Sequence, residues 1–580
     1  MFILDQYIEL WIAYGKGKKE GARLEVTVQN ISETLFCTER NSKLIIKKLD
    51  ELNWIKWFPG RGRGNRSKLI FQKHPISLIL DRGKEITKKG DVKSGSIFVE
   101  RYSSHFPSVK GEYHCWVDSI FGHKIEMTSE GRRDVLRLQV QMNLDITLDP
   151  VYATMRSECH MVKHIFDTLV YVDGNTNIIE PRLAFHWEYN DAEKIWTFYL
   201  RKGVHFQNGK QLTAHDVIYS LNRFMKLENN AHAWMLQHVE SIRSVDDYVV
   251  EIQLHTENKM FLHMISAEQC SIVNEDEAGE LIGTGPFQLY KSNENLFILE
   301  GHPLYFRERP FLDRVELWNV EQGVSTYDVL VKAQYKDKEK EKHNKELSRL
   351  ESNVTYITCN LTKEGPMQDE LFRKALYKII HGYTIVQELG GERGEVAKKL
   401  ILAGESIVEI EEDVESLIKR STYHNEVLQL YTFTGRDHVE DAQWIQKECA
   451  KYGIRVENNF LDIEELLEVS TIQKADMMHD SATISERIED SLLYMFLTKN
   501  SFIHGQSNMD FYEKLSIYFK QEELEKRVTL LRDIEDTLLR QIHIIPLYRN
   551  KQEVSTHEKV QNIMINSQGW IDFYNIWFKS

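Results

Sequence analysis

Residues 54–71 read WIKWFPGRGRGNRSKLIF, with two alternating, aromatic-rich runs around a loop of glycine, proline and arginine. Alternation of apolar and polar residues predicts β-strands, and glycine and proline are typical of turns. We therefore expect Trp54–Phe58 and Ser67–Phe71 to pair as an antiparallel hairpin. The loop is not a phosphate-binding P-loop, because it lacks the Gly-Lys-Ser/Thr ending and does not lead into a helix.

Three helices are predicted before this hairpin. Apolar residues recur at helical intervals over residues 4–14, 26–36 and 39–52, and Thr38 is a candidate N-cap for the third helix. The order of three helices and a hairpin is that of a winged helix-turn-helix, whose third helix enters the major groove of DNA. We expect the core-facing stripe of that helix to consist of Leu44, Ile45, Leu49 and Leu52.

Positive charge is concentrated in the same region. Residues 1–75 hold 14 Lys and Arg against 8 Asp and Glu, whereas the whole chain has a net charge of −15. The first 75 residues therefore carry +6 and the rest of the chain −21. A small basic unit joined to a large acidic one is typical of a protein with two tasks, one of them directed at a polyanion.

The loop of the hairpin has the composition of a DNA-binding wing. Arginine complements phosphate and a narrow minor groove, and glycine allows a close approach. The alternative is a solvated basic turn, but the helix order and the local charge favour binding to double-stranded promoter DNA. The residues expected to face the major groove are Arg40, Asn41, Ser42, Lys43 and Lys47. Those expected to hold the DNA backbone are Arg61, Arg63, Arg66 and Lys68.

The segment ERNSKLIIKKLDELNWIKWFPGRGRGNRSKLIF resembles the N-terminal DNA-binding domain of the SgrR family of bacterial transcription regulators. The resemblance depends on the end of the predicted third helix, two tryptophans, the glycine-arginine wing and the strand after it. These residues are Leu52, Trp54, Trp57, Gly60–Gly64, Ser67, Leu69 and Phe71. It implies a DNA-binding domain over residues 1–75. Residues 76–130 contain amphipathic pieces and few signals, and we expect them to form a connecting helical segment.

A second resemblance covers most of residues 134–575. The block KIWTFYLRKGVHFQNGKQLTAHDVIYSLNRF (194–224) is similar to the signature of oligopeptide-type extracellular solute-binding proteins, family 5. Further landmarks follow in the order of the family, among them GTGPFQLY (283–290), LYFRERPFLDRVELW (304–318) and IIPLYRN (544–550). The resemblance implies two α/β lobes that close on a ligand.

The expected fold is therefore multidomain, an N-terminal winged helix-turn-helix (α+β) plus a C-terminal bilobal α/β domain like that of periplasmic binding proteins. The ligand-sensing domain is expected over residues 131–580. One lobe would contain about 131–320 and 545–580, and the other about 321–544.

Candidate ligand contacts come from both expected lobes. They are Tyr152, Arg156, Thr284, Tyr431, Phe433, His479 and Asp480. Peptide receptors of the family usually carry a glycine, an aromatic residue and an acidic-proline pair where this chain reads MMHDSATISERIED (477–490), so peptide is not favoured. The best-known role of the SgrR family, in sugar-phosphate stress, implies by analogy that the ligand is a small metabolite such as a sugar or sugar phosphate.

The sequence does not favour a metalloprotein, an enzyme, a membrane protein or a secreted protein. The six cysteines form no Cys-x-x-Cys pair, and Cys159, His160 and His164 are better explained as ordinary helix residues than as metal ligands. No catalytic motif is present, so we expect neither an enzyme nor a cofactor. No apolar run approaches the ~18 residues of a membrane span. The lysines follow the first apolar stretch instead of preceding it, which is the reverse of a secretory signal, and we expect a cytoplasmic protein.

Two functions therefore remain. The first is a one-component transcriptional regulator whose solute-binding domain senses a metabolite. The second is the solute receptor of an ABC transporter, in which the N-terminal unit would mediate a protein contact. A homo-oligomer is a further expectation, because winged-helix regulators usually bind paired half-sites.

Overall fold

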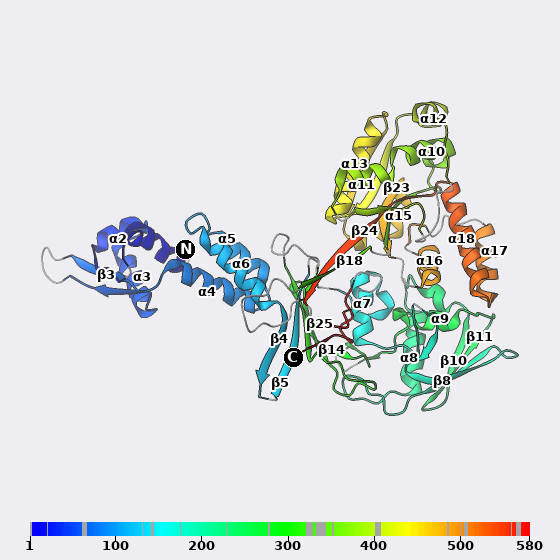
Figure 1. Ribbon diagram of the computed structural model, residues 1–580, viewed down its shortest axis with the longest axis horizontal. Coiled ribbons are helices and arrows are strands. Elements are labelled where there is room, and N and C mark those ends of the chain that lie inside the picture. Colours follow the sequence, from blue (N-terminus) through cyan, green and yellow to red (C-terminus); the bar gives the residue numbers. More distant parts are fainter. Residues whose placement is uncertain are drawn as a thin grey trace.

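A computed structural model gives the structure of the chain (Figure 1). It describes residues 3–19, 21–60, 66–129, 131–140, 144, 146–174, 176–228, 230–275, 279–320, 329–331, 344–350, 353–391, 393–400, 408–483, 487–499, 501–503, 509–557, 560–563 and 570–579. These residues form an N-terminal unit that projects to one side and a larger body of two lobes.

The N-terminal unit begins with three helices and a small sheet. The helices are α1 (Ile3–Leu10), which continues as a π-helical turn (Trp11–Gly15), α2 (Val28–Thr34) and α3 (Glu39–Glu51). The antiparallel sheet has the order β1-β3-β2, formed by β1 (Leu24–Val26), β2 (Ile55–Phe58) and β3 (Ser67–Phe71). The predicted helices and hairpin are confirmed, in the arrangement of a winged helix-turn-helix.

Helix α3 begins where its cap predicts but buries a different face. The Oγ1 atom of Thr38 accepts a hydrogen bond from the backbone N–H of Asn41 at 3.3 Å, which satisfies one of the free donors of the first turn. The predicted stripe is only half right, since Leu44 is 62% and Leu52 42% exposed. The buried face consists of Ser42, Ile45, Ile46 and Leu49.

Three further helices belong to the same unit. They are α4 (Pro75–Lys88), α5 (Val92–Glu100) and α6 (Ser108–Ile120). Their buried residues share one apolar core with the winged helix-turn-helix, and the Thr87 and Tyr113 hydroxyls within it lie 2.5 Å apart. Residues 76–120 are therefore not only a connection between domains. The N-terminal unit extends to about Phe121, well beyond the expected boundary at residue 75.

The first lobe contains a five-stranded sheet next to this unit. Its order is β14-β15-β16-β5-β4, and only the pair β16–β5 is parallel. The strands are β4 (Gly122–Thr128), β5 (Gly131–Val140), β14 (Phe287–Asn293), β15 (Leu296–Gly301) and β16 (Arg314–Asn319). Helix α7 (Arg156–Ile165) and residues 571–578 pack into the core of this sheet.

The second part of the first lobe is built on an antiparallel sheet of order β10-β11-β9-β8. The strands are β8 (Ala184–Asn190), β9 (Ile195–Leu200), β10 (Val239–Asp246) and β11 (Val249–Leu254). Its core also takes in helices α8 (Ala214–Lys226), α9 (Phe261–Ile265), α16 (Ile488–Leu497), α17 (Met509–Lys520) and α18 (Leu524–Arg540). The expectation that all of residues 321–544 belong to the second lobe was therefore wrong for α16–α18. Short strand pairs lie beside it, β6 (Val170–Val172) with β7 (Ile179–Pro181), and β12 (Asn274–Glu275) with β13 (Leu281–Ile282).

The second lobe has a mixed sheet whose main path is β17-β24-β19-β23-β21-β22. The strands are β17 (Val329–Val331), β18 (Asn344–Leu350), β19 (Asn353–Cys359), β20 (Arg393–Val396), β21 (Val427–Phe433), β22 (Arg455–Leu461), β23 (Met477–Thr483) and β24 (Ile544–His557). The accompanying helices are α10 (Glu370–Ile379), α11 (Gly382–Leu389), α12 (Val414–Arg420), α13 (Arg436–Ala450), α14 (Ile463–Leu466) and α15 (Val469–Lys474).

The C-terminal segment returns to the first lobe later than expected. Residues Ile544–Tyr548 of β24 pair with β19 inside the second lobe, so the first lobe does not resume at residue 545. The return comes with β25 (Val560–Gln561) and β26 (Trp577–Phe578), which pair near the first-lobe core. Strand β24 thus runs from one lobe toward the other (Figure 1).

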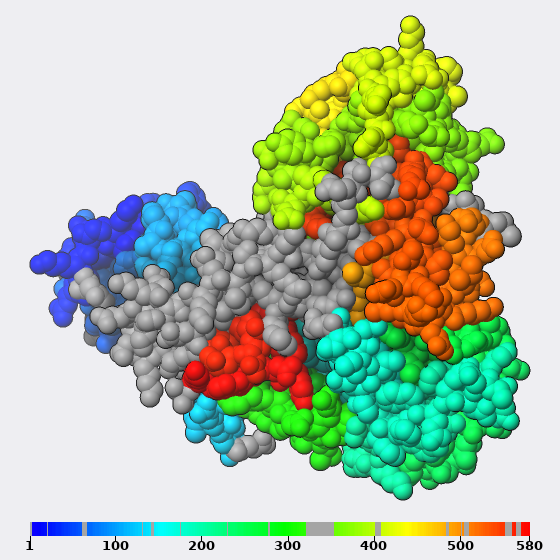
Figure 2. All heavy atoms as spheres, turned by 45° about the vertical axis from the view of Figure 1, so that its right-hand side comes forward, coloured from blue at the N-terminus to red at the C-terminus, as the bar shows by residue number. Residues whose placement is uncertain are grey.

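Figure 2 shows the lobes and the projecting N-terminal unit as a surface, with the helices of residues 509–540 in orange along one side of the two lobes. Among the described residues, none of the helices combines the length and the apolar character that crossing a bilayer requires. Two parts of the fold are candidate functional sites, the outer face of α3 with its hairpin and the region where the lobes meet.

Candidate nucleic-acid interface and ligand-sensing lobes

The outer face of α3 carries the predicted cations. Arg40, Lys43 and Lys47 are exposed, and so is Asn41, whose backbone rather than its side chain is used by the Thr38 cap. The Nζ atom of Lys47 lies 3.7 Å from a carboxylate oxygen of Glu51, and both side chains are mostly exposed. Solvent-exposed pairs of this kind are weak, so Lys47 can turn to a phosphate at little cost.

Ser42 does not belong to this face. Its side chain is fully buried, and its hydroxyl lies 3.2 Å from the backbone oxygen of Thr38 and 3.2 Å from the Sγ atom of Cys37. The expectation that Ser42 faces the groove was therefore wrong. A polar residue was expected to be exposed, but a serine in a helix can be buried when its hydroxyl donates a hydrogen bond to a backbone carbonyl of the preceding turn.

The hairpin is fixed against the end of α3. The backbone N–H of Trp57 donates to a carboxylate oxygen of Asp50 at 3.0 Å, and this hydrogen bond fixes the orientation of the hairpin relative to α3. Arg66 and Lys68 are exposed on the returning side of the hairpin. Arg61 and Arg63 lie outside the described residues.

The first-lobe candidates for ligand contact separate into two places. Tyr152 ends the short 3₁₀ turn η2 (Pro150–Tyr152) and is 40% exposed, and Arg156 begins α7 with an exposed side chain. Thr284 is fully buried instead, and its Oγ1 atom donates to Asp167 at 3.3 Å. Asp167 is itself 2.9 Å from the Nε atom of Arg182. Thr284 therefore helps to order a buried ion pair.

The second-lobe candidates lie on the neighbouring strands β21 and β23. Tyr431 and Phe433 are half-buried against a small cluster formed around Leu466, Ala475 and Met478. Asp480 is half-buried on the opposite sheet face from His479 and accepts a hydrogen bond from the Tyr356 hydroxyl at 3.3 Å. Burial raises the pKa of Asp480 to about 6, in spite of the opposing contacts from Ser481, His479 and Tyr356.

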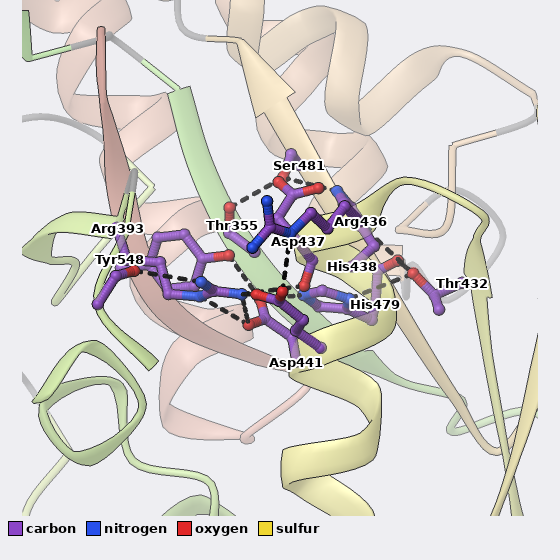
Figure 3. A network of polar contacts seen from close by, with 12 residues as sticks. Thr355, Arg393, Thr432, Arg436, Asp437, His438, Asp441, His479, Ser481 and Tyr548 are labelled. Carbon is purple, nitrogen blue, oxygen red and sulfur yellow. Dashed lines mark hydrogen bonds and ion pairs between the residues drawn. The ribbon is translucent and has the colours of Figure 1, made fainter. Parts of the chain in front are cut away.

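His479 belongs to a buried polar network drawn in Figure 3. Its Nε2 atom lies 3.3 Å from Asp441 on α13, and its Nδ1 atom lies 3.2 Å from the Thr432 hydroxyl. Thr432 also contacts the Nδ1 atom of His438 at 3.0 Å. Because the exposed fraction of His479 is zero, we interpret it as a residue that organises the lobe and no longer as a ligand contact.

The same network ties β20 and β24 to α13. The Nε atom of Arg393 donates to a carboxylate oxygen of Asp441 at 2.8 Å, and the Tyr548 hydroxyl donates to the other oxygen. Burial by itself raises the pKa of the Asp441 carboxyl, but the contacts with His479, Arg393 and Tyr548 outweigh it and hold the pKa below its usual value. Asp441 is therefore a buried, fully compensated charge.

A charged cluster that sequence reasoning missed lies near the start of α16. Lys163 of α7 is 2.7 Å from Glu268 in the 3₁₀ turn η4 (Glu268–Cys270). Arg487 lies 2.8 Å from Asp490 and donates to the Ser266 hydroxyl at 2.8 Å, which connects the start of α16 to the end of α9. The sequence gives no local signal for the cluster, because the contacts Lys163–Glu268 and Arg487–Ser266 join residues more than 100 positions apart, and Arg487 and Asp490 by themselves are an ordinary i,i+3 pair.

Lys163 and Glu268 form a partly accessible ion pair within this cluster. The Lys163 side chain is 46% accessible, yet burial is the largest single influence on its pKa. Burial acts to lower this pKa, and the Glu268 carboxylate overcomes the effect and raises it. The pairing with Glu268 therefore stabilises the charged form of Lys163 in spite of its partial desolvation.

The residues considered as metal ligands are packed in the core of the first lobe. The rings of His160 and Trp570 stack at 4.9 Å, and those of His164 and Phe573 at 4.8 Å. Across the described part of the chain, no group of three or more His, Cys, Asp or Glu side chains has the geometry to hold a metal ion.

Comparison with known protein families gave two matches. Residues 179–503 match the bacterial extracellular solute-binding proteins, family 5 (middle region). Residues 3–107 match the N-terminal domain of the sugar transport-related sRNA regulator. This second match runs through α4 and α5, in agreement with the extended N-terminal unit.

Similar proteins include two curated relatives. The chain is 36% identical over 565 residues to the uncharacterized protein YhjP of Bacillus subtilis, covering 96% of each chain. It is 26% identical over 320 residues to the HTH-type transcriptional regulator SgrR of Yersinia pestis, covering 54% of this chain and 53% of the relative. A similar solved structure is the oligopeptide-binding protein AppA from Bacillus subtilis in complex with a nonapeptide, at a TM-score of 0.65 and 16% identity. That likeness covers 77% of this chain and 100% of the other.

Proposed function

The chain belongs to family 5 of the bacterial extracellular solute-binding proteins, and from this premise we propose that it is a DNA-binding transcriptional regulator that senses a small metabolite. The observation that carries the proposal is the exposed basic face of α3, held in one geometry with a basic hairpin at the far end of the N-terminal unit. The likeness of residues 3–107 to a regulator domain and the relative named SgrR support it.

DNA contact is assigned to two sets of residues. Arg40, Asn41, Lys43 and Lys47 present side chains to the major groove, while Arg61, Arg63, Arg66 and Lys68 neutralise phosphates. Phosphate contacts release counterions, so each contributes to the salt dependence of binding but not to sequence preference.

The test is fluorescence anisotropy of the full-length protein with DNA from its own upstream region, at two or more salt concentrations. An Arg66→Ala/Lys68→Ala variant should bind every sequence more weakly, and its log–log salt slope should be smaller by about 1.8. A Lys419→Ala/Lys447→Ala variant removes two exposed charges from the second lobe and serves as the matched control. Full affinity and an unchanged slope in the wing variant would disprove the phosphate contacts.

The effector is proposed to be a sugar or a sugar phosphate, bound where the lobes meet. Each cation described above in that region, Lys163, Arg182 and Arg487, is already paired with a carboxylate. An anionic phosphate would have to compete with those carboxylates, which favours a neutral sugar. Calorimetric titration with a panel of free and phosphorylated sugars distinguishes the two.

A transport receptor is the second candidate, favoured by the fold likeness to a peptide-binding protein. The two candidates differ in location, since a regulator works in the cytoplasm beside DNA and a receptor works outside it. Immunoblotting of cytoplasmic and extracytoplasmic fractions decides between them. We expect the chain in the cytoplasmic fraction, and recovery outside the cytoplasm would favour the receptor.

A further inference from the structure

Leu44 lies near the centre of the exposed face of α3. With 3.6 residues per turn, it shares a side of the helix with Arg40 and Lys47, opposite the buried Ile45 and Leu49. Its side chain is 62% exposed, so it contributes little to the core of the N-terminal unit. An apolar residue in this place has no evident structural role.

The surroundings of Leu44 are cationic. Arg40, Lys43, Lys47 and Lys48 surround it, all of them exposed. The nearby carboxylates are partly used, since Glu51 lies 3.7 Å from Lys47 and Asp50 accepts the Trp57 N–H. An apolar tip inside a ring of cations matches the major groove, where phosphates form the rims and the thymine methyl is the apolar group of the floor.

We propose that Leu44 is a specificity-determining residue that contacts thymine C5-methyl groups in the major groove. The inference rests on the proposed DNA-binding function and adds to it a base preference. Lysine and arginine on the same face set the position on the duplex, and the leucine discriminates thymine from cytosine, whose major-groove edge has no methyl group. Burial of one methyl corresponds to about a fourfold change in affinity.

The test removes the leucine side chain and the thymine methyl groups separately. Wild type and Leu44→Ala are titrated by anisotropy against the upstream duplex and against the same duplex with deoxyuridine in place of thymidine, which deletes only the methyl groups. Wild type should lose about fourfold or more on the deoxyuridine duplex. Leu44→Ala should bind the thymidine duplex about five- to twentyfold more weakly and should not distinguish the two duplexes.

Three controls keep the result specific. Leu44→Met retains an apolar tip and should keep most of the thymidine preference. Ile97→Ala trims another exposed apolar residue, 54% exposed on α5, and should bind like wild type. The salt slope of Leu44→Ala should be unchanged, because no charge is removed.

Either of two outcomes overturns the inference while leaving the proposed function intact. These are wild-type affinity in Leu44→Ala, or a deoxyuridine effect that persists in that variant. Absence of DNA binding by wild type at any salt overturns both together. A change of sedimentation coefficient in Leu44→Ala without a change in DNA binding would instead assign the leucine to contact with a second copy.

Discussion

Phe36 occupies the turn between α2 and α3 with its side chain 96% exposed and its backbone in the left-handed region, at φ 50°. Both properties are unfavourable for a bulky residue, since the left-handed conformation costs about 1–2 kcal/mol for residues other than glycine and asparagine. Strain of this kind persists mainly at functional positions. The turn also lies directly before the proposed recognition helix.

Replacing Phe36 with asparagine should stabilise the N-terminal unit by about 1 kcal/mol, because asparagine tolerates the left-handed conformation and no buried contact is lost. Hydrogen exchange measures this locally, as slower exchange of the α2 and α3 amides. Val245→Asn is the control and should give no gain, because Val245 is another exposed apolar residue, at a bulge of β10, whose φ is not in the left-handed region. Faster exchange in Phe36→Asn would mean that the ring makes a stabilising contact.

Asp480 gives a prediction about pH at the same scale. Its pKa in the folded chain is raised to about 6, so the folded state holds a proton that the unfolded state releases near pH 4. The group therefore costs no stability below about pH 4, an increasing amount between pH 4 and 6, and the full penalty above pH 6. Asp480→Asn keeps the acceptor for the Ser481 N–H and removes the charge.

The thermal unfolding midpoint of Asp480→Asn should therefore exceed that of wild type at pH 8, and the difference should vanish toward pH 4. Asp191→Asn is the matched control, because its side chain is 79% exposed and its charge is removed at little cost. A gain at pH 8 that persists unchanged at pH 4 would show that ionisation of Asp480 is not its source.

At the scale of elements, the network of Figure 3 holds β20, β21, β23 and β24 against α13. Its central ion pair is Arg393 with Asp441, both almost fully buried. Asp441→Ala leaves the guanidinium without its carboxylate and should destabilise the second lobe by about 3–5 kcal/mol near neutral pH. The comparison is Glu440→Ala, which removes a 38% exposed carboxylate 3.3 Å from the same guanidinium and should cost about 1 kcal/mol or less.

The pH dependence has the opposite sign to that of Asp480. The lowered pKa of Asp441 means that its contribution is complete above the unfolded pKa of about 4 and is lost as the pH falls through the folded value. Chemical denaturation should therefore show a smaller difference between wild type and Asp441→Ala at pH 3 than at pH 7. Equal differences at the two pH values would contradict the ion-pair account.

The elements that were predicted correctly depend on local signals. The Thr38 cap and the alternation on both sides of the hairpin are readable within a few residues, and the structure has α3 and β2–β3 in those places. The error over Leu44 came from assuming that an apolar residue on a helix is buried. That assumption fails at recognition surfaces, where apolar side chains are kept for a partner.

The network residues could not be recognised in the same way. His479 was a candidate ligand contact because it lies in MMHDSATISERIED (477–490), where peptide receptors of the family contact their ligand. Its burial depends on Asp441, 38 positions earlier, and on Thr432, 47 positions earlier. Pairing of β24 with β19 joins residues that are almost 200 positions apart. Contacts at such separation leave no periodic trace in the sequence, which is why the lobe boundary at 545 was misplaced.

At the scale of the whole molecule, the N-terminal unit is fixed to the first lobe. Leu296, Ile298, Trp318 and Val320, on and just after the strands β15 and β16, belong to the same apolar core as α4–α6. Gly90, with φ 103°, allows the close approach, since a Cβ atom there would lie 2.8 Å from a Leu296 methyl. If the second lobe moves on ligand binding, it would therefore move relative to a rigid assembly of the N-terminal unit and the first lobe.

Trp318→Ala should loosen this joint without altering the proposed DNA-binding surface. The ring of Trp318 packs edge-on against Phe121 at 6.1 Å and is 6% exposed, so its removal should cost about 3–5 kcal/mol at the joint. Helix α3 and the hairpin lie in the opposite part of the unit and should keep their affinity for DNA (Figure 1). Small-angle scattering should give a larger radius of gyration than for wild type.

The functional consequence concerns coupling between the two sites. Coupling through a rigid joint requires that both sites bias the same arrangement of the molecule, so a loose joint should abolish the effect of the ligand on DNA affinity while each site still binds its own partner. Trp577→Ala, at a 37% exposed tryptophan of β26, is the matched control and should retain both the compact dimensions and the coupling. If Trp318→Ala expands the molecule yet leaves the ligand effect on DNA binding unchanged, the signal travels by another route, such as contact between two copies of the chain.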